Sequence, residues 1–520
     1  MTASLILKNV RALTMDPAQP RASAVAVGGG RILAVGDEVD VEALRGPATR
    51  VIDGGGRALL PGFVDAHCHL LAYAAYLLSV DCASAPSIAD IQAALRRRAQ
   101  ELRPGIWLRA VGYHEADLRE GPSHCVGALA RAGRVSVEGR HPNRWDLDAA
   151  VPHHPVRLIH RSGHACVLNS PALELCQINI NTEEPPGGYI DREPTTGEPT
   201  GLLLEMNDLV EAHIPPLPYE DLCRGAALAS QRLLAGGVTA VQDATPGGPG
   251  ERALLDRLAA EGHIRSRLRS MVGYEHRYDW DEVGAGPGAC PYFVKIVVRE
   301  LGQEVYPGPE ALADMLREVH QAGLAAAIHA VEERAIEAAL SALERLPRPD
   351  RHRHRLEHCA LCPPLLAGRL ARLGATVVTQ PSFLYHSGDR YLREVPPEKQ
   401  GYLYPLAELQ RRGVPLAAGS DAPVAPPDPL LGIYGAVARR SREVRPLAGQ
   451  GLSAQEALEM HTLAAARACG WEAELGSITP GKRADLVLLS DDPTTVPAEL
   501  IPSLTVALVI LEGEVAWGEV

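Results

Sequence analysis

The chain has 520 residues, of which 46% are hydrophobic and 22% are charged, so it can bury a sizeable core and is not expected to be disordered. Its formal net charge of -13 excludes the basic surface that a nucleic acid or an anionic membrane would require. The N-terminus lacks a basic and apolar leader and no segment approaches about 18 uninterrupted apolar residues, so we expect a cytoplasmic protein.

Both ends of the chain have the pattern of short strands. Residues 1–57 alternate apolar and polar positions between Gly, Pro and Asp, as in SLILKNVRALTMD and ASAVAVGGGRILAVGD. A period of two predicts antiparallel strands joined by tight turns. Residues 470–520 repeat this pattern in ADLVLLSDDP and SLTVALVILEGEVAWG. We therefore predict that 1–57 and 470–520 pair into one small β-sandwich.

Between the two ends, residues 58–469 consist of short apolar runs that end in a polar residue, most of them followed by a helical stretch. This is the rhythm of βα units around a parallel sheet. Apolar positions three and four apart predict helices at 309–323, 332–346 and 406–413. Eight strand-like runs predict an α/β fold, a (β/α)8 TIM barrel. The runs are 58–67, 237–243, 265–273, 292–298, 324–329, 354–358, 375–380 and 414–421.

The connection between the first two of these runs is much longer than one crossover helix requires. Its residues 100–220 contain a strand-like VRLIH and the turn-rich GGYIDREPTTGEPTGLLLE. Long connections in barrel enzymes usually lie over the active-site face. We therefore expect 100–220 to be an inserted segment that caps the substrate.

His67 and His69 lie at the end of the first predicted barrel strand. Residues two apart on a strand share a face, so both imidazoles can reach one metal ion. The pair alone is weak evidence for a metal site, because hydrogen-bonded histidine pairs are common in proteins. Four later runs carry further possible ligands, and the C-terminal ends of parallel barrel strands meet at one mouth. These residues are Lys295, His329, His358 and Asp421.

Two other motifs have an ordinary structural interpretation. Cys359 and Cys362 form a CxxC, but no second CxxC or suitably spaced histidine pair completes a structural zinc set. We expect the ten cysteines to be mostly reduced and buried. The basic run RHRHR at 351–355 is expected to be a solvated loop.

Over nearly its whole length, the chain resembles the amidohydrolase superfamily, and more narrowly its YtcJ-like group, which includes N-substituted formamide deformylases. The resemblance is carried by PGFVDAHCHL, RSGHACVLNSPAL, GVTAVQD, RLEH, GSDAPVAPPDPLLGIYGAVAR and GSITPGKRADLVLLSDDP. It implies a site with one or two divalent ions, usually zinc, and hydrolysis of an amide-like or related bond. It also implies that His67, His69 and Asp421 hold one ion, and that His329 and His358 hold the second.

The resemblance further implies that Lys295 bridges the two ions if CO₂ carboxylates its amine. Unmodified lysine is a poor ligand, because it is protonated at neutral pH with an ordinary pKa of about 10.4. The alternative is a lysine that extends from the strand end to water or to a carboxylate.

Three residues are expected to act in catalysis: Asp421, His358 and His164. A zinc-bound water has a pKa of about 7, and Asp421 would take its proton and pass it to the leaving amine. Alternatively, Asp421 caps the turn that follows it. His164, in RSGHACVLNS, would lie near the substrate or make a structural hydrogen bond. Weaker candidates from the same insert are Tyr113, His114 and Glu205.

The expected function is hydrolysis of an amide, N-formyl or cyclic amide-like C–N bond in a small molecule, and a homodimer is compatible with it. Relatives often carry Asp-Gly where this chain has Arg299-Glu300, and Gly-Asp where it has Glu332-Glu333. Neither change removes a ligand, but both leave the substrate open. The same barrel could host a metal-dependent isomerase or decarboxylase. A non-catalytic metal-binding relative is a third alternative, and the full ligand set argues against it.

Overall fold

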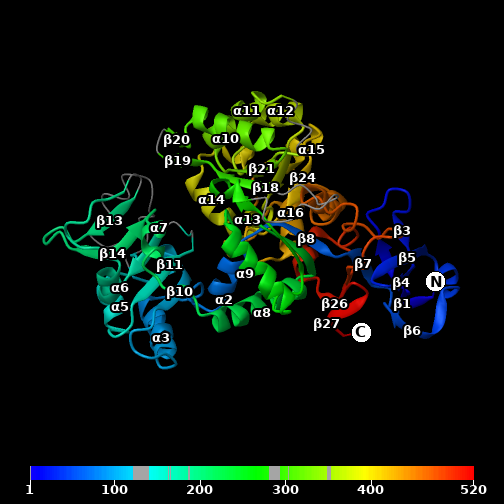
Figure 1. The fold of residues 1–520 in the computed structure, drawn as a ribbon, viewed down its shortest axis with the longest axis horizontal. Coiled ribbons are helices and arrows are strands. Elements are labelled where there is room, and N and C mark those ends of the chain that lie inside the picture. The colour runs from blue at the N-terminus through cyan, green and yellow to red at the C-terminus, as the bar shows by residue number, and fades with distance from the viewer. Residues whose placement is uncertain are drawn as a thin grey trace. The chain divides into compact units, whose positions relative to one another are not determined.

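The structure is a computed structural model that describes residues 2–120, 140–161, 163, 165–185, 188–279, 293–301, 304–347 and 353–519. The chain divides into two compact units. The first unit is Met1–Leu71 with Ala226–Val520, and the second unit is Ala72–Gly225. Figure 1 draws the helices and strands as a ribbon and labels many of them. Within the described ranges, every helix is too short or too polar to cross a membrane.

The two ends of the chain share a six-stranded sheet in the first unit. β7 (Ala58–Pro61) pairs with β25 (Leu486–Leu489), so that Leu59 is in register with Leu488. The order of the sheet is β27-β26-β25-β7-β2-β3. Its other strands are β2 (Arg11–Leu13), β3 (Arg21–Ala22), β26 (Val506–Leu511) and β27 (Glu514–Gly518). Strands from the first 61 residues and the last 35 thus belong to one sheet.

A second sheet of this part has the order β5-β4-β1-β6. Its strands are β1 (Ala3–Lys8), β4 (Ala24–Gly28), β5 (Arg31–Gly36) and β6 (Arg45–Asp53). Gly29 and Gly30 join β4 to β5 with φ angles of 59° and 74°, which a two-residue hairpin turn requires. Apolar residues of both sheets form one buried core that includes Leu5, Leu7, Val27, Ile32, Leu59, Leu486, Leu488 and Ile510.

The rest of the first unit contains parallel strands that match the eight predicted runs, although β8 and β21 each extend one residue beyond the run. They pair in parallel as two groups, β8-β15-β16 and β17-β18-β21-β22-β23-β24. Their bounds are β8 (Phe63–Cys68), β15 (Val238–Asp243), β16 (Arg267–Ser270), β17 (Val272–Gly273), β18 (Phe293–Val297), β21 (Ala325–Ala330), β22 (Arg355–His358), β23 (Thr376–Thr379) and β24 (Leu416–Ala418).

Backbone hydrogen bonds link these two groups of strands. The third predicted run is divided into β16 and β17 at Met271, whose amide donates to the carbonyl of Asp243 at 2.8 Å. Just beyond β24, the amide of Asp421 donates to the carbonyl of His67 at 2.7 Å. The last strand is therefore held against the first at the end that carries the candidate ligands.

α-Helices follow most of the parallel strands in the described part of the chain. The predicted helices at 309–323, 332–346 and 406–413 correspond to α10 (Pro309–Gln321), α11 (Glu333–Glu344) and α15 (Leu406–Arg411). The proline that opens α10 suits a first turn, where a missing amide hydrogen costs no intrahelical bond. The same helix buries Leu312, Leu316 and Val319, because positions three and four apart share a face. Other helices are α8 (Tyr219–Ala235), α9 (Pro249–Ala260), α12 (Pro364–Leu373), α16 (Pro429–Ala438), α17 (Ala454–Met460) and α18 (Leu463–Ala468).

The second unit has a sheet and a core of its own. The order of the sheet is β13-β14-β12-β11-β10-β9. Its strands are β9 (Val80–Asp81), β10 (Leu108–Tyr113), β11 (Val156–His160), β12 (Ala165–Leu168), β13 (Tyr189–Arg192) and β14 (Pro199–Leu204). Ile91 and Leu95 of α3 (Ile88–Ala99) pack into one core with Leu108 and Leu158. The segment predicted as an insertion, 100–220, lies within this unit.

The expectation of a solvated loop at 351–355 is wrong for the residues nearest the strand. His354 is 2% exposed and Arg355 is fully buried. The guanidinium of Arg355 donates to the side chains of Glu357 at 2.6 Å and Gln242 at 2.7 Å, and to two backbone carbonyls. A buried charge is tolerated when it is paired and hydrogen-bonded in this way. Residues 351 and 352 lie outside the described residues.

The eight cysteines that the structure describes are all free, and seven of them are buried, as expected. Burial raises the pKa of Cys359 well above its ordinary value and that of Cys362 to about 12. Both thiols of the CxxC therefore stay protonated at neutral pH, which argues against a redox role.

Candidate metal centre

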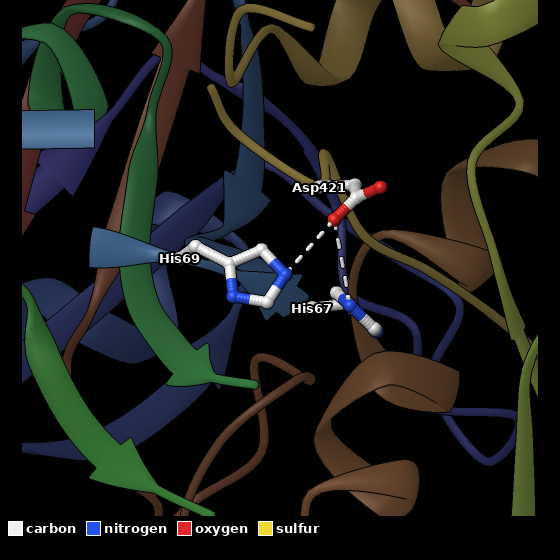
Figure 2. A group of neighbouring side chains, drawn as sticks. All are labelled: His67, His69 and Asp421. Carbon is white, nitrogen blue, oxygen red and sulfur yellow. Dashed lines mark ion pairs between the residues drawn. The ribbon is translucent and has the colours of Figure 1, made fainter. Parts of the chain in front are cut away.

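His67 and His69 converge on the carboxylate of Asp421. The two histidines flank Cys68 at the end of β8, and Asp421 follows β24. The distance from Asp421 Oδ1 is 3.2 Å to His69 Nε2 and 3.5 Å to His67 Nε2. Figure 2 shows both imidazoles directed at this oxygen. Asp421 has a φ of 57°, a left-handed conformation in which its amide donates to the His67 carbonyl.

These three side chains fit a divalent ion. Their ligand atoms all lie within 4.8 Å of one another. Tetrahedral zinc has bonds of about 2.0–2.2 Å to nitrogen and oxygen, which places neighbouring ligand atoms about 3.3–3.5 Å apart. The two distances of 3.2 Å and 3.5 Å agree with that spacing. Imidazole and carboxylate donors in this arrangement are those that zinc prefers.

Each of the two histidines is oriented through its other ring nitrogen. His67 Nδ1 contacts the carboxylate of Glu357, which also accepts a hydrogen bond from Arg355 Nε at 2.6 Å. His69 Nδ1 lies 3.1 Å from Thr245 Oγ1. When Glu357 accepts a hydrogen bond from the Nδ1–H of His67, the lone pair of Nε2 remains available to bind a metal ion. A carboxylate behind a histidine is a common feature of metal sites.

The other predicted ligands lie beside His67. Lys295 of β18 is buried, with Nζ 3.4 Å from His67 Nε2. The ring of His358 is centred 4.8 Å from that of His67, and the ring of His329 is centred 4.4 Å from that of His358. His358 Nδ1 lies 2.9 Å from Gln380 Oε1, whereas its Nε2 is buried and forms no hydrogen bond with any described residue. A buried imidazole nitrogen with an unused lone pair is suited to bind a second ion.

Burial governs the protonation of this group. It lowers the pKa of His67, His329 and His358, so all three imidazoles are neutral at pH 7. Burial also lowers the pKa of Lys295, against the opposing effect of nearby carboxylates. For Asp421, burial alone would raise the pKa, but the hydrogen bond from His69 and the neighbouring histidines outweigh it and hold the pKa well below its usual range. Neutral imidazoles and an ionised carboxylate are the metal-binding forms.

Sequence reasoning did not single out the groups that support these ligands. Glu357 and Arg355 occupy alternate positions of β22, and both are fully buried. Asp65 accepts hydrogen bonds from the amides of Ser420 at 2.9 Å and His67 at 3.1 Å. Burial raises the pKa of Asp65 to about 6. Charged residues at alternate positions of a central strand were the available signal for Arg355 and Glu357.

The remaining candidates are placed elsewhere or not described. His164 lies outside the described residues. Tyr113 and His114 belong to the second unit. Glu205 follows β14, is exposed and has a φ of 52°. The alternative role of Asp421 as a helix cap belongs instead to Asp428, whose carboxylate accepts hydrogen bonds from the first amides of α16.

Comparisons with known proteins give a consistent result. A family model described as the amidohydrolase family matches residues 50–516. N-substituted formamide deformylase of Arthrobacter pascens is 30% identical, covering 98% of this chain and 97% of that protein. Putative amidohydrolase YtcJ of Bacillus subtilis is 27% identical, covering 97% of each. An uncharacterized metal-dependent hydrolase from Pyrococcus horikoshii has a similar fold, with a TM-score of 0.73 at 23% identity over 95% of this chain and 99% of that one.

Proposed function

The chain belongs to the amidohydrolase family and is a metal-dependent hydrolase of carbon–nitrogen bonds other than peptide bonds. We propose that it cleaves an amide, N-formyl or cyclic amide-like bond in a small molecule. The observation that carries this proposal is the convergence of His67 and His69 on Asp421, with oxygen-to-nitrogen distances of 3.5 Å and 3.2 Å. The formamide deformylase that is 30% identical supports the bond class.

We infer that the parallel strands close into a (β/α)8 barrel. Their unbroken order along the chain supports this inference, as does the hydrogen bond between Asp421 beyond the last strand and His67 on the first. The two sheets built from the chain ends share one buried core, which supports a β-sandwich. The candidate ligands would then lie at the C-terminal mouth of the barrel, and the capping role of 100–220 stays a prediction.

We expect one or two divalent ions, with zinc as the first choice because the donors are imidazole and carboxylate. His67, His69 and Asp421 would hold the first ion, and His329 and His358 the second. When bound, such an ion lowers the pKa of a water to about 7 and polarises the carbonyl of the substrate. The ionised carboxylate of Asp421 would accept the proton of that water and deliver it to the leaving nitrogen.

Two further roles follow from the same group. The depressed pKa of Lys295 favours the neutral amine, which would attack CO₂, lose a proton and become a carbamate able to bridge two ions. Its contact with His67 supports this role. His358 would bind the ion through Nε2, which is buried and has no hydrogen-bond partner among the residues that the structure describes. His164 stays a prediction of substrate contact.

This chain differs from its relatives at Arg299-Glu300 and Glu332-Glu333, and a glutamate of each pair has a partner in the structure. Glu300 accepts a hydrogen bond from the Ala335 amide at 2.9 Å, and so caps the first turn of α11. Glu333 pairs with Lys399 at 3.1 Å, on side chains that are each 43% exposed. Both departures therefore support the start of α11, and neither gives a reason to change the proposed bond class.

Metal analysis of purified chain tests the proposal. We expect one to two zinc-like ions per chain at the group around His67, and His67→Ala should abolish binding at the first site of this group without unfolding the protein. His153→Ala, which changes an exposed histidine outside these ligand groups, is the control and should keep the full metal content. A His67→Ala chain that remains fully metallated would contradict the assignment, as would a folded wild-type chain that binds no metal.

A further inference from the structure

Three histidines and a glutamate gather at one end of the sheet of the second unit. β10 and β11 are neighbouring parallel strands, and Tyr113 at the end of β10 is in register with His160 at the end of β11. His114 and Glu115 follow β10 directly, and His141 lies just before α5 (Arg144–Asp148). Since the C-terminal ends of parallel strands meet at one edge, residues far apart in the sequence come together here.

One oxygen of Glu115 faces three imidazole nitrogens. Glu115 Oε2 lies 2.9 Å from His160 Nε2, 3.6 Å from His114 Nδ1 and 3.8 Å from His141 Nε2. The four side chains are between 6% and 12% exposed, so water is largely excluded from them. The ligand atoms of His114, Glu115 and His160 all lie within 4.8 Å of one another.

We propose that these residues form a second metal site, in which His114, Glu115 and His160 bind a zinc-like divalent ion and His141 is the fourth ligand. Tetrahedral zinc with nitrogen and oxygen ligands spaces neighbouring ligand atoms about 3.3–3.5 Å apart. The distances of 2.9, 3.6 and 3.8 Å around Glu115 Oε2 lie on both sides of that value. The site shares no residue with the group around His67.

The orientation of His141 supports its role as a ligand. Its Nδ1 lies 2.9 Å from the hydroxyl of Tyr113, whereas its Nε2 is buried without a hydrogen bond in the described part of the chain. A metal-binding histidine usually donates its other ring N–H to an oxygen, which fixes the ring and leaves one lone pair for the ion. The bidentate ion pair of Arg140 with Asp146 holds this part of the chain against the start of α5.

The number of protein ligands indicates what the ion would do. Zinc sites that bind and activate water generally have three protein ligands and an open fourth position, whereas sites with four protein ligands are structural. Four side chains are available here, so we assign the ion a structural role. It would join the ends of β10 and β11 to the segment before α5. The ligands His114 and His160 are separated by 46 positions in the sequence. The competing interpretation is an ion-pair network in which one protonated histidine neutralises Glu115.

Metal stoichiometry of the full chain separates the two interpretations. We expect Glu115→Gln/His160→Asn to bind one ion fewer per chain than the wild type, whatever number the group around His67 binds. His153→Asn changes an exposed histidine of the same unit and should leave the count unchanged. An ion-pair network predicts equal counts in all three proteins, and that result would overturn the proposal.

Anomalous scattering at the zinc edge, from wild-type crystals soaked in zinc, tests the site without any substitution. A peak bonded to Glu115 and His160 is expected in addition to any peak at His67 and His69. The peak at His67 and His69 serves as an internal control that zinc has entered the crystal. A map with zinc at His67 and none at Glu115 would overturn the proposal, even if the double variant failed to fold.

Discussion

The orientation of His67 depends on buried charged groups that its own motif does not contain. Glu357 contacts Nδ1 of His67, and Arg355 donates to Glu357 at 2.6 Å. The sequence predicted the candidate ligands because their types and positions at strand ends are recognisable. It did not predict that Glu357 and Arg355 orient His67, because the sequence does not distinguish a buried, paired charged residue from a solvated one. The basic run before β22 was misjudged for that reason.

Glu357→Gln should weaken metal binding while preserving shape. The amide accepts the Nδ1–H of His67 less strongly than the carboxylate, so the basicity of Nε2 falls. We expect about a 10- to 100-fold loss of zinc affinity, measured by competition with a chromophoric chelator. Glu337→Gln, on the exposed side of α11, is the matched control. Equal affinities in the two variants would show that Glu357 does not orient the ligand.

His461 should make the protein sensitive to acid. Burial lowers its pKa to about 3, whereas the unfolded chain takes up the proton below about 6.5. Stability present above pH 6.5 is therefore lost as the pH falls toward 3, at about 1.4 kcal/mol per pH unit. Thermal unfolding of His461→Leu between pH 7 and 5 should depend less on pH than that of His153→Gln, in which an exposed histidine is changed. Parallel pH curves would contradict this account.

At the scale of elements, strands and helices with strong periodicity were predictable. β18, β22 and β23 lie within predicted runs, and α10 and α11 lie within predicted helices. Local conformations were not predictable, since left-handed φ angles at His358 and Asp421 depend on the contacts that hold them. The same applies to the close approach of β24 to β8, where a glycine provides the necessary room.

Gly419→Ala should disturb that approach. A Cβ at this position would lie 2.6 Å from the backbone nitrogen of His67, so the two strand ends would have to separate. Overpacking of this kind typically costs about 1–3 kcal/mol. We expect a lower thermal midpoint together with weaker zinc binding. Gly401→Ala introduces a methyl group into open space and should change neither property. Normal zinc affinity in Gly419→Ala would contradict the role of this contact.

At the scale of the whole molecule, the rhythm of the sequence indicated both a parallel βα region and a long interruption in it. The structure describes that interruption as part of a separate unit, Ala72–Gly225, with its own sheet and core. Its histidine cluster was only partly foreseen through His114, because His141 and His160 lie in segments without a metal-binding pattern. Ligands contributed by several loops have no spacing that a single sequence can display.

Metal-dependent release of amine tests the central claim most directly. Chain stripped of metal by chelation is incubated with N-substituted formamides, N-acyl amines and cyclic amides, before and after zinc is added. The account predicts amine release from at least one class, present only with zinc and lost in His67→Ala. A fully metallated wild-type chain that releases no amine from any class would contradict it, and would favour isomerisation or decarboxylation by the same residues.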